Sequence, residues 1–212
     1  MSNNTEGWTV IIPIKPLPIA KSRLEGTRRN ASTADLARAF AKDLVAATTH
    51  VAFVDQVIAV TSESTLAPEL ISLGATVLDE PNQLTGDLNA VLDYAQRQVL
   101  SQHPHCAIAI VTADLATIQA RSLESFLVGA ANCKTGYVAD HSGSGTSVLI
   151  NRTGHVVATA FGARSADAHR ERGFDDLTEL ADARLRLDID TPEDLESAIA
   201  IGLGAATRRL IE

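Results

Sequence analysis

The first residues with the chemistry to act on a ligand are cations in one short loop. In "VIIPIKPLPIAKSRL", from Val10 to Leu24, an apolar run breaks into a loop that holds Lys15, Lys21 and Arg23. The chain has only four lysines, and two of them lie in this loop. Gathered cations receive the negative charge of phosphate groups. The alternative interpretation is a solvated surface loop.

Three aspartates could together hold a metal ion. Asp114 follows the apolar run "AIAIV", and Asp188 and Asp190 stand in "LDIDTPEDL". Alternation along a strand directs the last two side chains to one side. Mg²⁺ prefers a few carboxylates together with phosphate oxygens, and it neutralises the charge of a nucleoside triphosphate. The alternatives are that Asp190 only begins the next helix and that Asp188 is solvated.

Composition excludes several classes of protein. A net charge of −8 over 212 residues argues against a nucleic-acid partner, which needs a basic face. No apolar run reaches the roughly 18 residues that span a bilayer, and "MSNNTEG" is no signal peptide. Cys106 and Cys133 are too few for a disulfide framework. We expect a cytoplasmic protein with small-molecule partners, no nucleic acid and no membrane. Its basic patches, 15–29 and 164–172, suit small polyanions.

The elements that must position these residues follow from apolar periodicity. Short, nearly continuous β-branched runs predict buried parallel strands at 8–14, 57–60, 75–78 and 107–111. Helical periods predict helices at 32–49, 62–74, 86–100 and 120–131. This β-α alternation predicts an α/β fold with a mostly parallel sheet flanked by helices.

The pattern changes after residue 130. "TGYVADHSGSGTSVLIN" predicts two strands around a Ser/Gly-rich turn, which would form a small antiparallel insertion. "TPEDLESAIAIGL" predicts a helix with Thr191 as its N-cap and Asp194 at its third position. No linker or repeat interrupts the chain, so we expect a single domain over residues 1–212.

The predicted topology places the site. Ligands of open α/β sheets bind beyond the carboxyl ends of the strands, where the Lys15 loop and Asp114 should meet. The chain has no GxxxxGK[ST] loop, and no GxGxxG follows the first strand, so a nucleotide must be held in another way. "HPHC" at 103–106 matches no standard zinc spacing and is interpreted as a surface turn. His141 is interpreted as turn surface as well.

Five motifs in order resemble one known family. "KPLPIAKSRL" after the first strand, "TADLA", "GSGTSVL", "FGARSADAH" and "LDIDTPEDL" are similar to segments of the phosphoenolpyruvate or 2-phospho-L-lactate guanylyltransferases of coenzyme F-420 biosynthesis. These enzymes belong to the nucleotidyltransferase group that includes the molybdenum-cofactor guanylyltransferases. The resemblance covers nearly the whole chain. It implies a Rossmann-like, GT-A-like nucleotidyltransferase sheet and Mg²⁺ as the cofactor.

The resemblance also implies a reaction. GMP would pass from GTP to phosphoenolpyruvate or 2-phospho-L-lactate, with release of pyrophosphate and formation of enolpyruvyl- or lactyl-diphospho-guanosine. The acceptor's phosphate is already an anion, so positioning and charge neutralisation would supply the catalysis. Phosphoenolpyruvate is favoured because the later motifs look most like those of the bacterial enzymes that use it. A homodimer is compatible with the sequence, although no feature requires one.

Residue by residue, the resemblance assigns roles in binding GTP, which is the donor of GMP, and the metal ion. The basic loop would receive the triphosphate and the departing pyrophosphate through Lys15, Lys21 and Arg23. Asp114 and Asp188 match metal-binding aspartates, and Asp190 is close enough to share that role.

On the acceptor side, the matching region spans about 136–175. Thr146, Gly162 and Ser165 match positions that hold the acceptor acid, and His169 behind them would add positive potential. Asn89, in "GDLNAVL", is the candidate for contact with guanine and ribose.

One departure from the family and two rival functions bear on this assignment. The family usually reads Gly-Asp-Leu-Pro at the central aspartate, whereas this chain reads "ADLA" from Ala113 to Ala116.

The rival functions are a non-catalytic nucleotide-binding regulator and a nucleotidyltransferase for another phosphorylated acceptor. A molybdopterin enzyme would open with an LxGGxSxRxG-type loop, which this sequence lacks.

Overall fold

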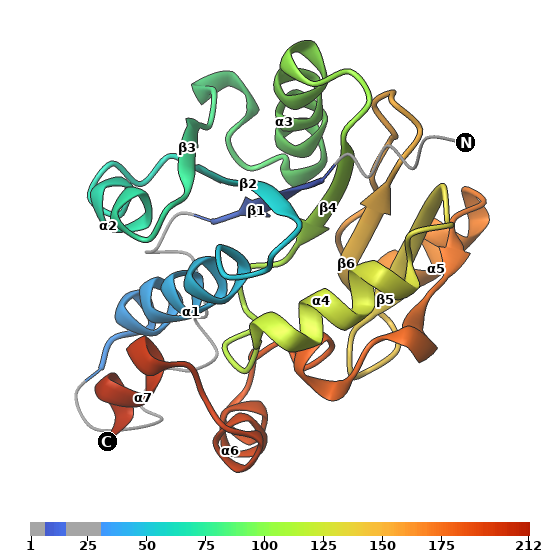
Figure 1. Ribbon diagram of the computed structural model, residues 1–212. Helices are drawn as coiled ribbons and strands as arrows, with labels where there is room; N and C mark the ends of the chain where they lie inside the picture. The colour runs from blue at the N-terminus through green and yellow to red at the C-terminus, as the bar shows by residue number, and fades with distance from the viewer. Residues whose placement is uncertain (1–6, 16–30) are drawn as a thin grey trace.

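Four short β-branched runs form the parallel half of a seven-stranded sheet (Figure 1). The computed structural model describes residues 7–15 and 31–212. The parallel strands are β1 (Trp8–Pro13), β2 (Val54–Thr61), β3 (Thr76–Asp79) and β4 (Ala107–Val111). β1 pairs in parallel with both β2 and β4, and β3 extends the sheet beyond β2. Every residue of β1 and β4 is buried, which explains their continuous apolar runs.

A helix follows each of these strands, as predicted. The four helices are α1 (Thr33–Thr48), α2 (Ala67–Ser72), α3 (Leu88–Gln102) and α4 (Ala120–Gly129). α1 begins with the predicted capping box, in which Ser32 Oγ accepts the N–H of Asp35 at 3.1 Å. α2 is shorter than predicted because its first turn starts near Pro68, after a turn over residues 64–66.

The antiparallel insertion is confirmed. β6 (Thr146–Asn151) lies between β4 and β5 (Thr135–Ala139) and runs antiparallel to both. A two-residue strand, β7 (Asp175–Asp176), pairs in parallel with β5 and was not predicted. The resulting strand order is β3-β2-β1-β4-β6-β5-β7.

Three helices complete the described chain: α5 (Ser165–Glu171), α6 (Pro192–Ile201) and α7 (Ala205–Ile211). Short 3₁₀ turns lie at Asn82–Leu84, Thr178–Leu180 and Ala183–Leu185. α6 has the predicted capping box of Thr191 and Asp194. Among the helices of the described chain, none is long and apolar enough to span a membrane.

The strand expected around Asp188 and Asp190 is wrong. Residues 187–190 join no strand of the sheet. Leu187 and Ile189 instead pack into an apolar cluster with α1 and α6, so the segment crosses beside the sheet. Its alternation of buried and exposed residues resembles a strand without the ladder of hydrogen bonds.

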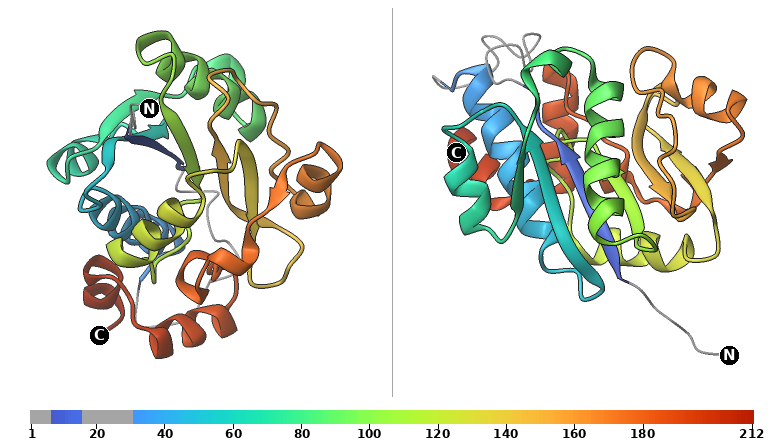
Figure 2. Two further views of the ribbon diagram at one scale, coloured as in Figure 1. Left: turned by 45° about the vertical axis from the view of Figure 1, so that its right-hand side comes forward. Right: turned by 90° about the horizontal axis from the view of Figure 1, so that it is seen from above.

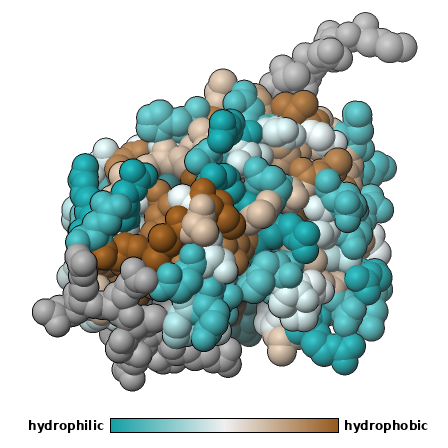
Figure 3. All heavy atoms as spheres, turned by 90° about the horizontal axis from the view of Figure 1, so that it is seen from below, coloured by the Kyte–Doolittle hydropathy of each residue, from teal (hydrophilic) through white to brown (hydrophobic). Residues whose placement is uncertain are grey.

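Helices cover both faces of the sheet (Figures 1 and 2). Val10 and Ile12 of β1 belong to the apolar cluster shared with α1 and α4, whereas Ile11 belongs to the cluster shared with α3 and α5. α6 and α7 form an outer layer against α1, on the side viewed in Figure 3. Hydrophilic residues cover most of that side, and an apolar area is exposed toward its left.

Candidate active site

A pocket of about 180 Å³ opens beyond the carboxyl ends of β1 and β4. The hydrogen bond from Ile14 N to Val60 O, at 2.8 Å, continues the strand pairing and leads the chain to Lys15 at the rim. The pocket brings Lys15, Asp114 and Asp190 together from three separate segments. Its remaining lining comes from the strand ends and two helices: Pro13, Ile14, Ala37, Phe40, Leu88, Thr112 and Ala113. Lys21 and Arg23 lie outside the described residues.

A second pocket, of about 290 Å³, adjoins the first and shares its lining from Pro13 to Lys15. It continues between the end of β2 and the start of α3, and its other lining residues are Val60, Glu80, Thr85, Gly86, Leu88 and Val91. Apolar walls with a few polar groups at the rim suit a flat ring with polar edges.

Two of the three aspartates form a crowded, poorly solvated pair. Ile189 N donates to Asp114 O at 3.2 Å, which holds the 187–190 segment against the loop after β4. Burial, followed by the charge of Asp114, raises the pKa of Asp188 to about 6. The hydrogen bond from His141 lowers this pKa but does not outweigh the burial and the charge of Asp114.

Asp190 takes a different position. It lines the 180 Å³ pocket, which Asp188 does not. Its backbone N–H donates to Asp194 Oδ2 at 3.1 Å, so its main chain takes part in the start of α6, as the alternative interpretation held. Within the described part of the chain, no three His, Cys, Asp or Glu side chains gather as a complete metal site.

His141 lies on an exposed turn, as the sequence indicated, and it also contacts two aspartates. Its Nδ1 lies 2.9 Å from Asp188 Oδ1, and its Nε2 lies 3.3 Å from Asp194 Oδ1. Partial burial opposes protonation, but the hydrogen bond with Asp188 and the neighbouring carboxylate charges outweigh it and raise the pKa of His141. The sequence held no signal for this contact because it joins residues 47 positions apart.

Thr146 reaches the same edge of the sheet from the antiparallel strand. Thr112 N donates to Ser147 O at 3.0 Å, so Thr146 lies beside the loop that carries Asp114. The preceding turn is built around Asp140, whose carboxylate accepts from Ser142 Oγ and from the N–H groups of Ser144 and Gly145. A Cβ at Gly145 would lie 2.2 Å from Asp140 Oδ2, which explains the glycine.

The start of α5 brings one of the two other predicted acceptor-binding residues, Ser165, near Thr146. Ala166 N donates to Ser144 O at 3.1 Å, which brings the start of α5 and its buried Ser165 to the turn. Gly162 is exposed and has a φ of 139°, a conformation that favours glycine. The structure therefore brings Thr146 and Ser165 into one region.

The positive potential predicted at His169 is wrong. The side chain is 0 % exposed, and its ring packs among those of Tyr137, Phe161 and Phe174. Burial, assisted by the charge of Arg172, lowers the pKa of His169 to about 4, so the ring is neutral at physiological pH. The imidazole touches Thr146 instead, with Nδ1 2.9 Å from Oγ1.

The side chain of Asn89 bonds to the protein, and its predicted contact with guanine and ribose stays a prediction. Asn89 is absent from the lining of both pockets, although Leu88 beside it lines both. Its Nδ2 donates to Phe161 O at 2.9 Å. Its Oδ1 accepts from Phe161 N and Thr159 Oγ1, each at 2.8 Å. Asn89 thus fastens α3 to the segment before Gly162.

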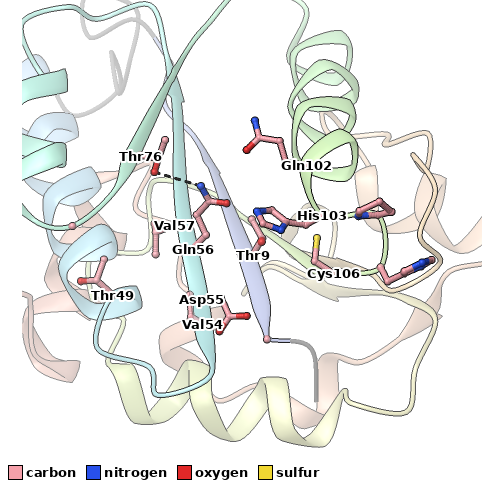
Figure 4. A pocket seen from close by; sticks show the side chains of 14 residues that line it. Thr9, Thr49, Val54, Asp55, Gln56, Val57, Thr76, Gln102, His103 and Cys106 are labelled. Atoms are coloured by element: carbon pink, nitrogen blue, oxygen red, sulfur yellow. Dashed lines mark hydrogen bonds between the residues drawn. The ribbon is translucent and has the colours of Figure 1, made fainter. Parts of the chain in front are cut away.

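A larger hollow, of about 770 Å³, lies at the opposite edge of the sheet (Figure 4). The amino ends of the parallel strands form it, with Gln56 Nε2 donating to Thr76 Oγ1 at 3.4 Å and with the "HPHC" turn at one side. None of the described residues that line it is a lysine or an arginine. This hollow therefore lacks the charge that a polyphosphate requires.

Comparisons with known proteins relate the chain to one family. The family model described as guanylyl transferase CofC like matches residues 8–212. The chain is 38% identical over 202 residues to a phosphoenolpyruvate guanylyltransferase of Streptomyces scabiei, with 94% of each chain covered.

Solved structures share the fold at low identity. A 4-diphosphocytidyl-2C-methyl-D-erythritol synthase has a TM-score of 0.62 and 16% identity, covering 92% of this chain and 99% of that one. A Mycobacterium tuberculosis protein in complex with manganese has a TM-score of 0.55 and 16% identity, covering 92% and 98%. From the family match and the similarity to its curated relative, the chain belongs to the CofC-like guanylyl transferase family.

Proposed function

We propose that this protein transfers GMP from GTP to phosphoenolpyruvate, releasing pyrophosphate and forming enolpyruvyl-diphospho-guanosine for coenzyme F-420 biosynthesis. The observation that carries the proposal is the carboxyl-edge pocket that gathers Lys15, Asp114 and Asp190. The relative from Streptomyces scabiei, a phosphoenolpyruvate guanylyltransferase, supports this choice of acceptor. The cytoplasmic location and the homodimer stay predictions from the sequence.

GTP is proposed to lie across the two adjoining pockets. Lys15, together with Lys21 and Arg23 of the same loop, would bind the triphosphate, because cations at the rim offset its charge. The 290 Å³ pocket would take the guanine and ribose between the end of β2 and Leu88 of α3. This arrangement directs the α-phosphate toward Asp114, which lines the pocket next to it.

Mg²⁺ fits the aspartates of this edge. Asp114 and Asp188 crowd two negative charges into a poorly solvated place, which favours a cation between them. Mg²⁺ is commonly held by one or two carboxylates plus phosphate oxygens, so a pair of aspartates suffices, with Asp190 near enough to join. When bound, the ion supplies positive charge to the phosphate oxygens.

The acceptor is proposed to lie against Thr146, Gly162 and Ser165. Hydroxyl and backbone N–H groups bind a carboxylate or phosphate without adding charge. A phosphate oxygen of the acceptor attacks the α-phosphorus of GTP, and the bond from that phosphorus to the bridging oxygen of the β-phosphate breaks. The electron pair leaves with pyrophosphate. No proton must be removed from the attacking phosphate, so these residues need only position it.

Pyrophosphate release tests the proposal. The purified protein with GTP, Mg²⁺ and phosphoenolpyruvate should release pyrophosphate and form a product with the mass of enolpyruvyl-diphospho-guanosine. Parallel reactions with 2-phospho-L-lactate and 3-phosphoglycerate measure the choice of acceptor. Binding of GTP without pyrophosphate release in any of the three would overturn the proposal and favour a non-catalytic regulator.

A further inference from the structure

The buried ring of His169 joins two parts of the proposed acceptor site. Nε2 accepts the backbone N–H of Ala160 at 3.0 Å, two residues before Gly162. Nδ1 lies 2.9 Å from Oγ1 of Thr146, on β6. One side chain of α5 therefore fixes the segment that leads to Gly162 and the hydroxyl of Thr146 at the same time.

These two contacts determine which ring nitrogen carries the proton. A neutral imidazole has one N–H donor and one acceptor nitrogen. A backbone N–H can only donate, so Nε2, which faces Ala160 N, is the acceptor nitrogen. The proton of the neutral ring is therefore on Nδ1, and Thr146 Oγ1 faces this N–H as an acceptor, beside the backbone of Ser165.

The surroundings keep the ring in this neutral form. Tyr137, Phe161 and Phe174 enclose it, with ring centroids 6.1, 5.3 and 5.3 Å from that of His169. The guanidinium of Arg172 contacts the segment just before Ala160, where it donates to the carbonyls of Ala158 and Thr159. Burial and then this positive charge lower the pKa of His169, while a hydrogen bond with the Ser165 backbone acts in the opposite direction.

The fixed ring has a consequence for Thr146. A hydroxyl has a single hydrogen, and an oxygen that accepts from Nδ1–H directs that hydrogen elsewhere. Thr146 is 7 % exposed and lies beside the loop of Asp114. A hydroxyl presented there as a donor attracts a carboxylate or phosphate oxygen, whereas one presented as an acceptor would repel it.

We propose that His169 is a positioning residue that makes the hydroxyl of Thr146 a hydrogen-bond donor to the anionic acceptor. The inference rests on the proposed guanylyl transfer and assigns His169 an action through Thr146 rather than through contact with substrate. Asn89 holds the other side of the same segment through Thr159 and Phe161. The ring therefore acts on a backbone that is already fixed.

Two substitutions at His169 separate its two contacts. His169→Gln can keep an acceptor for Ala160 N at the place of Nε2 but loses the donor to Thr146. His169→Asn can keep an N–H at the place of Nδ1 but loses the acceptor for Ala160. We expect His169→Gln to raise the KM for phosphoenolpyruvate by about 10- to 100-fold, as for a lost bond to a charged group, with the KM for GTP unchanged. His169→Asn should recover most of that loss.

A double-mutant cycle and the tautomer complete the test. In a Thr146→Val background, His169→Gln should have no further effect on the KM for phosphoenolpyruvate. Nitrogen-15 NMR of the wild-type protein should show His169 as the Nδ1–H tautomer at neutral pH, a measurement that needs no variant to fold. An Nε2–H tautomer, or equal losses in both variants, would overturn the inference. Wild-type protein without turnover would instead count against the proposed function.

Discussion

The two edges of the parallel sheet each carry a hollow, and the two hollows differ in charge as well as in size. The hollow at the amino edge is the larger, about 770 Å³ against about 180 Å³. Its described lining has no lysine or arginine, whereas the carboxyl edge gathers Lys15, Asp114 and Asp190. We therefore propose the carboxyl edge as the site from strand direction and charge, not from size. Loops that leave the carboxyl ends of parallel strands can bring separate segments together.

The edges also differ in the charge that they hold away from solvent. At the amino edge, Gln56 and Thr76 bond to each other. At the carboxyl edge, burial and the nearby charge of Asp114 raise the pKa of Asp188, so the ionised form is held at a cost in free energy. Functional sites often carry such a cost because a ligand relieves it.

The largest expected effect is at Asp114. Asp114→Asn keeps the size of the side chain but removes the charge proposed to hold the metal, so pyrophosphate release should fall by about 100-fold or more. The matched control at the other edge is Asp55→Asn, which should leave turnover unchanged. Equal losses in the two variants would erase the distinction between the edges.

A smaller effect is expected at Lys15. Lys15→Ala removes one cation from the rim of both carboxyl-edge pockets, and we expect the KM for GTP to rise by about 10-fold, because one charged hydrogen bond is lost. Lys134→Ala removes the same charge from another exposed position and should leave the KM unchanged. A similar rise in both variants would mean that only the total charge matters.

Asn89 joins α3, which borders the proposed GTP pockets, to the segment that leads to Gly162 in the proposed acceptor site. Asn89→Ala leaves the N–H and C=O of Phe161 without these partners, so the protein should lose about 1–3 kcal/mol of unfolding free energy in urea. The KM for phosphoenolpyruvate should rise more than that for GTP. Arg97→Ala, on the exposed side of α3, is the control, and a loss of GTP binding alone would contradict this account.

Asp188 offers a test in which stability and activity move in opposite directions. Its folded pKa of about 6 lies above the ordinary 3.8, so ionisation lowers the stability of the metal-free protein as pH rises through that window. Asp188→Asn should therefore raise the melting temperature well above pH 6, lose that gain by about pH 4, and reduce turnover. Thermal melts without divalent ions measure this. A lower melting temperature at every pH would contradict the proposed crowding.

The smallest effect is expected at the amino edge. Gln56→Ala removes the hydrogen bond to Thr76 in a partly exposed strand end, and turnover should stay within about twofold of the wild type. A large loss of turnover would mean that the larger hollow also contributes to the reaction.

Local sequence signals predicted the elements that build the carboxyl edge. The apolar runs from Trp8 and Ala107 gave β1 and β4, and the rule for strand ends then placed Lys15 and Asp114 together. Capping residues such as Ser32 and Thr191 predicted two helix starts, since the bonds that they make are local. These features depend on neighbours within a few residues, so a single sequence holds them.

Contacts between distant segments could not be predicted from the sequence. Asn89 and Phe161 are 72 residues apart, and nothing near either residue signals their contact. Asn89 makes two hydrogen bonds with Phe161 and one with Thr159. The burial of His169 depends on aromatic rings from separate segments, so its neutral form could not be anticipated from a basic stretch. The apolar alternation at 187–190 predicts a strand because packing against α6 produces the same period.

The position of bound GTP tests the central claim most directly. With Mn²⁺ in place of Mg²⁺, paramagnetic broadening of amide signals reports which edge of the sheet the nucleotide occupies. The account predicts the strongest broadening at Lys15 and Asp114, with Gln56 and Thr76 at the far edge affected least. Strongest broadening at Gln56 and Thr76 would contradict it, because the triphosphate would then lie where the described lining offers no lysine or arginine.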